Sequence, residues 1–142
     1  MTASLRVSAE ILELRTRHPF IIARGGSSDY RTVWVKVTDK DGREGWGEAP
    51  ESVLAAINLF AAAMPADPFD LETAEAQWGR MLRGNPAARV ALSTALHDLA
   101  AQRAGVPLHR LWGLDPKAAP RSTFTIGLDS EDAVAFSEDP RA

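Results

Sequence analysis

The chain has no cysteine, few lysines and no long uninterrupted hydrophobic run. Without cysteine, neither a disulfide framework nor a cysteine-based zinc site can form. Its 16 basic residues are outnumbered by 19 acidic ones, and they form no basic stripe of the kind that nucleic-acid binding needs. The most apolar stretch, residues 53–64, is interrupted by Asn58 and is too short to span a bilayer, and no signal-peptide pattern opens the chain. We therefore expect a cytoplasmic protein whose partners include neither nucleic acid nor a membrane.

Separate segments within residues 5–48 carry the two-residue alternation that is typical of half-buried strands. Apolar side chains take every second position in residues 5–11 and again in residues 33–37. A tight turn ends at Gly42, where glycine supplies the positive φ that such turns need, and a third strand returns after it. Gly45 and Gly47 in this third strand lack side chains, so we expect another backbone segment to approach closely there.

Helical periodicity replaces the strand pattern after residue 51. The first helix is expected to begin at Ser52, and the second at either Asp67-Pro68 or Asp70, because serine and aspartate are good N-caps. The third helix is expected to span residues 86–104, with a stripe of small residues that suits close packing: Ala87, Ala91 and Ala95. Since strands come first and helices afterwards, the expected fold class is α+β, an antiparallel three-stranded sheet followed by a helical bundle. A fourth strand is expected at residues 122–128, after the helices.

The longest connection between expected strands covers residues 17–30 and contains Arg24-Gly25-Gly26. A connection of this length is more than a hairpin needs, and long loops in compact domains often act as functional lids. A plain solvated loop is the competing interpretation. The double glycine is not a phosphate-binding loop, because neither a helix start nor a Lys-Ser or Lys-Thr pair follows it.

Two groups of side chains could carry chemistry. Glu44, Glu48 and Glu51 are the local carboxylate cluster of the hairpin. They could act as acid and base or bind a metal, but strand-edge charges or an interface hydrogen bond are the favoured interpretation. The three histidines are predicted to have no catalytic role, because none stands at the spacing of a known metal or nucleophile motif: His18, His97 and His109.

Four short motifs, in this order and spacing, resemble the front third of an enolase-superfamily enzyme of the muconate-lactonizing and dipeptide-epimerase type. They are Gly-Trp-Gly-Glu-Ala-Pro at 45–50, Ala-Leu-His-Asp at 95–98, Gly-Val-Pro-Leu at 105–108 and Ser-Thr-Phe-Thr-Ile-Gly at 122–127. The last motif points toward the dipeptide epimerases. The resemblance implies an N-terminal capping domain over residues 1–119 and the start of a truncated TIM barrel, including its first strand, over residues 120–142.

The resemblance also implies where substrate is met. Arg24 matches a position that can pair with a substrate carboxylate, for which the planar guanidinium is well suited. Thr125 is the second expected substrate-binding residue. Two loops that choose the substrate are expected to include the following residues: His18, Phe20, Gly25 and Gly26 in the first, and Glu48 and Pro50 in the second.

The chemistry itself is expected elsewhere in the parent enzyme. Enolase-superfamily members use a Lys or His base and stabilise an enolate with Mg²⁺. The only lysines here are Lys36, Lys40 and Lys117, and none matches the family's base motif. No residue matches the acidic metal ligands either. We therefore expect Mg²⁺ in the full-length parent, but no catalytic residue, no bound metal and no activity in this chain alone.

The leading hypothesis is the cap of an isomerase that interconverts configurations at the α-carbon of a small dipeptide such as Ala-Glu. A muconate cycloisomerase or an o-succinylbenzoate synthase relative is an alternative, and so is a non-enzymatic remnant that acts as a binding domain. In a closed barrel, residues 122–128 would have a neighbouring strand on each side. An unpaired apolar strand invites pairing with another chain, so we expect homo-oligomer formation through these residues, in preference to back-folding or disorder.

Overall fold

The computed structural model describes residues 5–122. Of the strand expected at 122–128, all but residue 122 lies outside the described residues, and so does Thr125. Residues 5–12 and 31–117 form one compact unit, and residues 13–30 with 118–122 belong to a second. Within the described residues, the two-layer body of the first unit holds the helices α1 to α4 and the strand β3.

A three-stranded sheet with the order β1-β2-β3 opens the chain, as predicted. The strands are β1 (Arg6–Ile22), β2 (Gly25–Thr38) and β3 (Glu44–Pro50). β2 and β3 pair antiparallel, with Thr38 opposite Glu44 and Trp34 opposite Glu48. Gly42, at a φ of 81°, closes the turn between them. Asp39 organises this turn, because its carboxylate accepts hydrogen bonds of 2.9 Å from the backbone N–H groups of Asp41 and Arg43.

The helices follow the sheet in the predicted order: η1 (Glu51–Val53), α1 (Leu54–Ala61), α2 (Leu71–Met81), α3 (Pro86–Ala104), α4 (Leu108–Leu111) and η2 (Pro116–Ala118). The expected cap at Ser52 is wrong, because a 3₁₀ turn begins at Glu51 and α1 starts only after Val53. The prediction for α3 is confirmed at both ends. Pro86 stands at its first position, and Gly105 ends it in the left-handed conformation at a φ of 67°.

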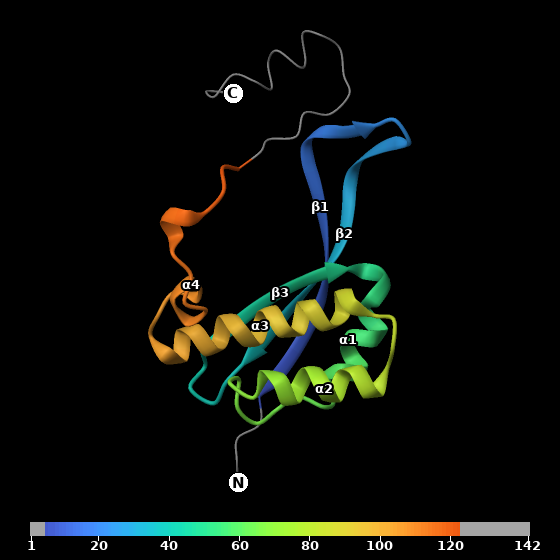
Figure 1. Ribbon diagram of the computed structural model, residues 1–142. Coiled ribbons are helices and arrows are strands. Elements are labelled where there is room, and N and C mark those ends of the chain that lie inside the picture. Colours follow the sequence, from blue (N-terminus) through green and yellow to red (C-terminus); the bar gives the residue numbers. More distant parts are fainter. Residues whose placement is uncertain (1–4, 123–142) are drawn as a thin grey trace. The chain divides into compact units, whose positions relative to one another are not determined.

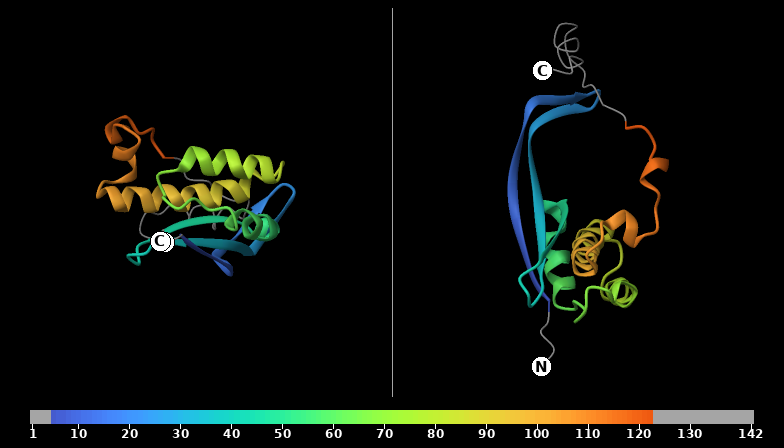
Figure 2. Two further views of the ribbon diagram at one scale, coloured as in Figure 1. Left: turned by 90° about the horizontal axis from the view of Figure 1, so that it is seen from below. Right: turned by 90° about the vertical axis from the view of Figure 1, so that its left-hand side faces the viewer.

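The core of the first unit lies between the sheet and the helices. In Figure 2, the right-hand view shows α1, α2 and α3 together on one face of the sheet. Val33, Val35 and Val37 point into this layer and are fully buried, as are Ile57 and Phe60 of α1. The indole N–H of Trp78 donates a 3.1 Å hydrogen bond to the Phe60 carbonyl, which satisfies the polar atom of the largest buried side chain.

α3 lies directly on β3, as Figure 1 shows, and the two glycines of β3 make this possible. A Cβ atom built on Gly45 would collide with the carbonyl oxygen of Ala95 and would stand 2.8 Å from Cβ of Leu99. A Cβ atom on Gly47 would collide with the carbonyl oxygen of Ala91. The small-residue stripe of α3 and the glycines of β3 therefore form one close backbone contact, which we call the β3–α3 seam.

Candidate functional site

The segment expected to be a long loop is instead the distal half of a β-hairpin. β1 continues to Ile22, β2 begins at Gly25, and only Ala23 and Arg24 form the turn. Gly25, at a φ of 120°, supplies a backbone conformation that other residues rarely adopt. The prediction of a loop over residues 17–30 is wrong because such a tight turn lets both strands pair almost to their ends.

Polar side-chain contacts lie at the surface of this distal hairpin, residues 13–30. The hydroxyl of Thr16 on β1 donates to the carbonyl of Ser28 on β2 at 3.4 Å, and within β2 the hydroxyl of Tyr30 donates to the carbonyl of Ser27 at 3.1 Å. Arg15 and Asp29 form an ion pair at 3.8 Å with both side chains largely exposed. The side-chain contacts described in the distal hairpin are therefore exposed and individually weak.

The structure brings five of the predicted site positions together near the hairpin turn. Phe20, Arg24 and Gly25 are exposed and lie within six residues of one another along the hairpin, and His18 belongs to the same strand as Phe20. Gly26 is needed for the pairing itself, because a Cβ atom there would stand 2.8 Å from the Phe20 carbonyl oxygen. An apolar side chain and a cation thus share an exposed turn, an arrangement that can contact a ligand carrying a carboxylate.

The other two described site positions, Glu48 and Pro50, lie at the end of β3. The carboxylate of Glu48 accepts a 2.7 Å hydrogen bond from the hydroxyl of Thr32, which is itself buried. Pro50 is exposed and is the last residue before the η1 turn. Glu48 is therefore held in a fixed position by β2.

The three glutamates of the hairpin do not form a shared site. Glu44 pairs with Lys36 at 3.0 Å, and Glu51 pairs with Arg31 at 3.0 Å, while Glu48 is engaged with Thr32. Within residues 5–122, no group of three His, Asp or Glu side chains could hold a metal ion. The favoured interpretation of strand-edge charges agrees with these contacts.

The Ala-Leu-His-Asp motif has a structural role in α3. Nδ1 of His97 lies 2.8 Å from the Ser93 carbonyl oxygen, and its ring packs edge-on against Trp112 at a centroid distance of 5.3 Å. The carboxylate of Asp98 accepts a 3.0 Å hydrogen bond from the backbone N–H of Trp46. Gln102, one turn further, donates to the Glu44 carbonyl at 2.7 Å. Asp98 and Gln102 thus satisfy backbone groups along the outer edge of β3, a role that no local pattern in the sequence indicates.

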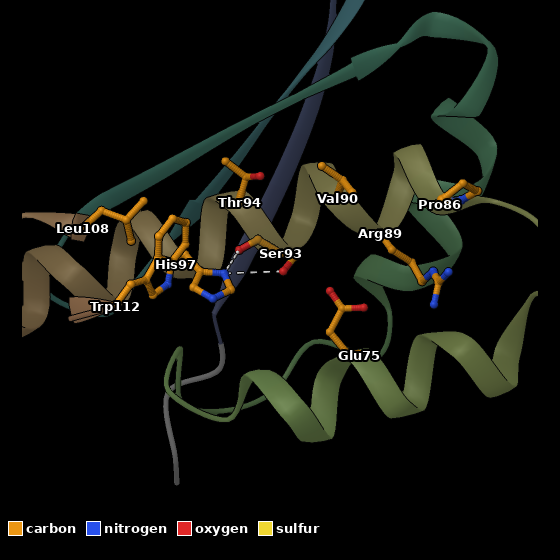
Figure 3. Close-up of a pocket in the computed structure, with 9 residues that line it drawn as sticks. All are labelled: Glu75, Pro86, Arg89, Val90, Ser93, Thr94, His97, Leu108 and Trp112. Atoms are coloured by element: carbon orange, nitrogen blue, oxygen red, sulfur yellow. Dashed lines mark hydrogen bonds between the residues drawn. The ribbon is translucent and has the colours of Figure 1, made fainter. Parts of the chain in front are cut away.

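A hollow, which we call the helical groove, lies among α2, α3 and α4 in the first unit and has a volume of about 340 Å³. Figure 3 shows that Glu75 projects into it from α2 and Arg89 from α3, while Leu108 of α4 and Trp112, the residue after α4, approach from the other side. Ser93 also lines it. The sequence gives no local signal for this groove, because its side chains come together only through helix packing.

In the described part of the chain, no helix combines the length and the apolar character needed to cross a membrane. The family described as mandelate racemase / muconate lactonizing enzyme, N-terminal domain, matches residues 6–113. The L-Ala-D/L-Glu epimerase of Bacteroides thetaiotaomicron is 33% identical over 131 residues, which cover 86% of this chain and 34% of that protein. The chain thus spans about a third of the length of the curated relatives it matches.

Two solved structures share the fold. The dipeptide epimerase from Enterococcus faecalis, complexed with Mg and the dipeptide L-Leu-L-Tyr, has a TM-score of 0.78 and 24% identity, and it covers 96% of this chain and 41% of its own. The 2-chloromuconate cycloisomerase from Rhodococcus opacus has a TM-score of 0.72 and 28% identity, over 78% of this chain and 34% of its own. The expected α+β capping-domain fold is confirmed by these likenesses.

Proposed function

The chain belongs to the family of mandelate racemase / muconate lactonizing enzyme N-terminal domains, and from this premise we propose that it is the substrate-selecting cap of a dipeptide epimerase-like isomerase. The observation that carries the proposal is the 33% identity to the L-Ala-D/L-Glu epimerase over 86% of the chain. Several further relatives are hydrophobic dipeptide epimerases at about the same identity. The cap comprises residues 1–119, and residues 120–142 begin the barrel.

In this proposal, the hairpin turn and the end of β3 supply the residues that face the substrate. Arg24 pairs with a carboxylate of the dipeptide, because its guanidinium can donate two parallel hydrogen bonds to one carboxylate. Phe20 gives the same turn an apolar contact, and Gly25 and Gly26 keep the backbone free of side chains. Glu48 and Pro50 belong to the second substrate-selecting segment, and Thr125 is a further substrate contact.

The cap supplies selection, and the remainder of the whole protein supplies the chemistry. The reaction is removal and return of the proton on the carbon next to a carboxylate, for which Mg²⁺ stabilises the enolate when it is bound. The described residues do not fit a Mg²⁺ site, because no three acidic side chains converge among them. The Mg bound in the E. faecalis dipeptide epimerase supports the use of this metal by a whole protein of this kind.

A muconate cycloisomerase-like activity is the second candidate, and the 28% identity to the R. opacus enzyme favours it. Dipeptides and muconates both present carboxylates, so Arg24 serves either substrate. The two candidates differ in what the whole protein converts, and a substrate assay therefore separates them.

The test is a chimera in which residues 1–119 replace the corresponding N-terminal part of the B. thetaiotaomicron epimerase. We expect Mg²⁺-dependent deuterium incorporation at the α-carbon of Ala-Glu dipeptides in D₂O, above the level of the same enzyme without a cap. Cooperative unfolding of the chimera establishes that it is folded. A folded chimera that exchanges no dipeptide contradicts the proposal, and conversion of chloromuconate by that chimera supports the second candidate.

A further inference from the structure

Two opposite charges line the helical groove without pairing. Glu75 on α2 and Arg89 on α3 both face the hollow, as Figure 3 shows. Among residues 5–122, neither side chain has an ion pair or a hydrogen bond to another residue, and Nε of Arg89 is buried with no partner. Native proteins leave few buried polar atoms without a hydrogen-bond partner. We therefore expect an acceptor for this nitrogen that is not among the described residues.

The guanidinium of Arg89 lies near α2. Its Nη1 would stand 3.6 Å from a Cβ atom built on Gly79 of that helix, which is an ordinary contact distance. Arg89 of α3 does not pair with Glu75 of α2. The groove therefore presents a cation and an anion at separate points. A ligand that carries both charges can satisfy both residues at once.

The rest of the groove is suited to an apolar group. Val90 is 58% exposed and Trp112 is 52% exposed, which are high values for side chains of their size in a folded unit. Ser93 adds a hydroxyl beside them. The groove is a hollow of about 340 Å³ with mostly apolar walls and a few polar groups, which is a size at the small end of the range for small-molecule sites.

We propose that the helical groove binds a small α-amino acid with an apolar side chain. Its carboxylate pairs with Arg89, its ammonium group pairs with Glu75, and its side chain packs against Val90 and Trp112. Arginine suits the first role because its donors match the two oxygens of a carboxylate. This site is independent of the proposed function, since it lies among the helices of the first unit and uses none of the residues assigned to substrate selection.

The first test uses the unaltered chain and three ligands, with binding measured by isothermal titration calorimetry. L-leucine is the complete ligand, 4-methylpentanoate lacks the ammonium group, and 3-methylbutylamine lacks the carboxylate. We expect saturable binding of L-leucine and a Kd at least about tenfold higher for each truncated ligand, which corresponds to the loss of one charged hydrogen-bonded contact. An absence of saturation with L-leucine, or equal binding of either truncated ligand, overturns the proposal.

The second test matches each lost ligand group with a lost side chain. Arg89→Met should weaken L-leucine binding about tenfold and leave 3-methylbutylamine binding unchanged, and Glu75→Gln should weaken L-leucine but not 4-methylpentanoate. The controls are Arg83→Met and Glu72→Gln, two exposed charges that do not line the groove. Equal losses in the controls overturn the assignment of these two residues. If a groove variant fails to unfold cooperatively, the ligand series on the unaltered chain still decides.

Discussion

The β3–α3 seam and the distal hairpin differ in packing: the seam is a close backbone contact, and the hairpin is exposed. In the seam, glycines face alanines and two backbones touch, so a single added methyl group has nowhere to go. In the distal hairpin, every described side chain except Ser28 is exposed, and the contacts are polar and at the surface. Stability concentrates where packing is dense, and segments with few buried contacts tolerate change. We therefore expect folding to depend on the seam and substrate choice to depend on the hairpin.

The largest expected effect is a change within the seam. Gly47→Ala places a Cβ atom against the backbone of Ala91, which cannot move without displacing α3 from the sheet. We expect the free energy of unfolding to fall by about 3 kcal/mol or more, because a clash with backbone atoms cannot be relieved by a side-chain rotation. Urea denaturation followed by circular dichroism measures it.

Gly79→Ala is the matched control for that change. The same methyl group at this position on α2 meets only Nη1 of Arg89, at an ordinary contact distance of 3.6 Å. Because alanine favours a helix over glycine, we expect an unchanged or higher stability, by up to about 1 kcal/mol. Equal losses at Gly47 and Gly79 would contradict the seam as the source of the effect.

The next effect tests the side chains that complete the seam at the edge of β3. Asp98→Ala removes the acceptor of the Trp46 backbone N–H and one acceptor of the Gln102 amide. We expect a loss of about 1.5 kcal/mol in the free energy of unfolding, because a hydrogen bond to a charged acceptor is lost at an exposed strand edge. Asp98→Asn keeps an oxygen in place and should lose less. If Asp98→Ala is as stable as Asp98→Asn, then the hydrogen bond from the Trp46 N–H to Asp98 does not stabilise the fold.

A smaller effect depends on pH and comes from the turn that leads into β3. Burial alone would raise the pKa of Asp39, but hydrogen bonds from the backbone N–H groups of Arg43 and Asp41, together with the Arg43 guanidinium, hold the pKa below its ordinary value of 3.8. The folded carboxylate thus binds its proton less readily than the unfolded one. Its contribution to stability is present above pH 3.8 and is lost as the pH falls through the lower folded value.

Asp39→Asn isolates this contribution. The amide oxygen still accepts a backbone N–H, so we expect a loss of only about 1 kcal/mol at pH 7. The stability difference between the two proteins should shrink as the pH falls below 3.8, and thermal unfolding between pH 7 and pH 2.5 measures it. A difference that stays constant over this range would mean that the charge of Asp39 does not matter.

The sequence predicts the seam better than the hairpin for a physical reason. α3 is bounded by Pro86 and Gly105, whose backbone preferences act locally, and the valines of β2 alternate because one face is buried. The distal hairpin is exposed on both faces, so no burial pattern marks its strands. Its Gly-Gly-Ser-Ser composition therefore suggests a loop, although a two-residue turn closes it.

The candidate sites show the same limit. The positions around Arg24 could be named because they are neighbours in the chain and match a family. The helical groove could not, since Glu75 and Arg89 come from different helices and meet only through packing. The link between Asp98 and Trp46 also joins residues far apart in sequence. Sequence periodicity indicates which face of an element is buried, but it does not say which element lies on it.

The smallest expected effect on stability is that of Arg24→Ala, at the turn of the distal hairpin. Arg24 is exposed, and a substitution at such a site changes the free energy of unfolding by about 0.5 kcal/mol or less. In the chimera with the epimerase, however, we expect KM for an acidic dipeptide to rise about tenfold, because a charged contact with the substrate carboxylate is lost. Both quantities are measured on the same preparation, by thermal unfolding and by deuterium exchange kinetics.

Arg15→Ala is the control, because it removes the same charge from the same hairpin, at a site where the ion pair among the described residues is with Asp29 across 3.8 Å of exposed surface. It should leave both the unfolding temperature and KM unchanged, since exposed ion pairs of this kind contribute little. If Arg24→Ala also leaves KM unchanged, or if both variants raise it equally, then general charge and not a contact at Arg24 governs substrate choice. A large drop in the unfolding temperature of Arg24→Ala would instead show that this turn contributes to stability. The expected difference in stability between the seam and the hairpin would then be wrong.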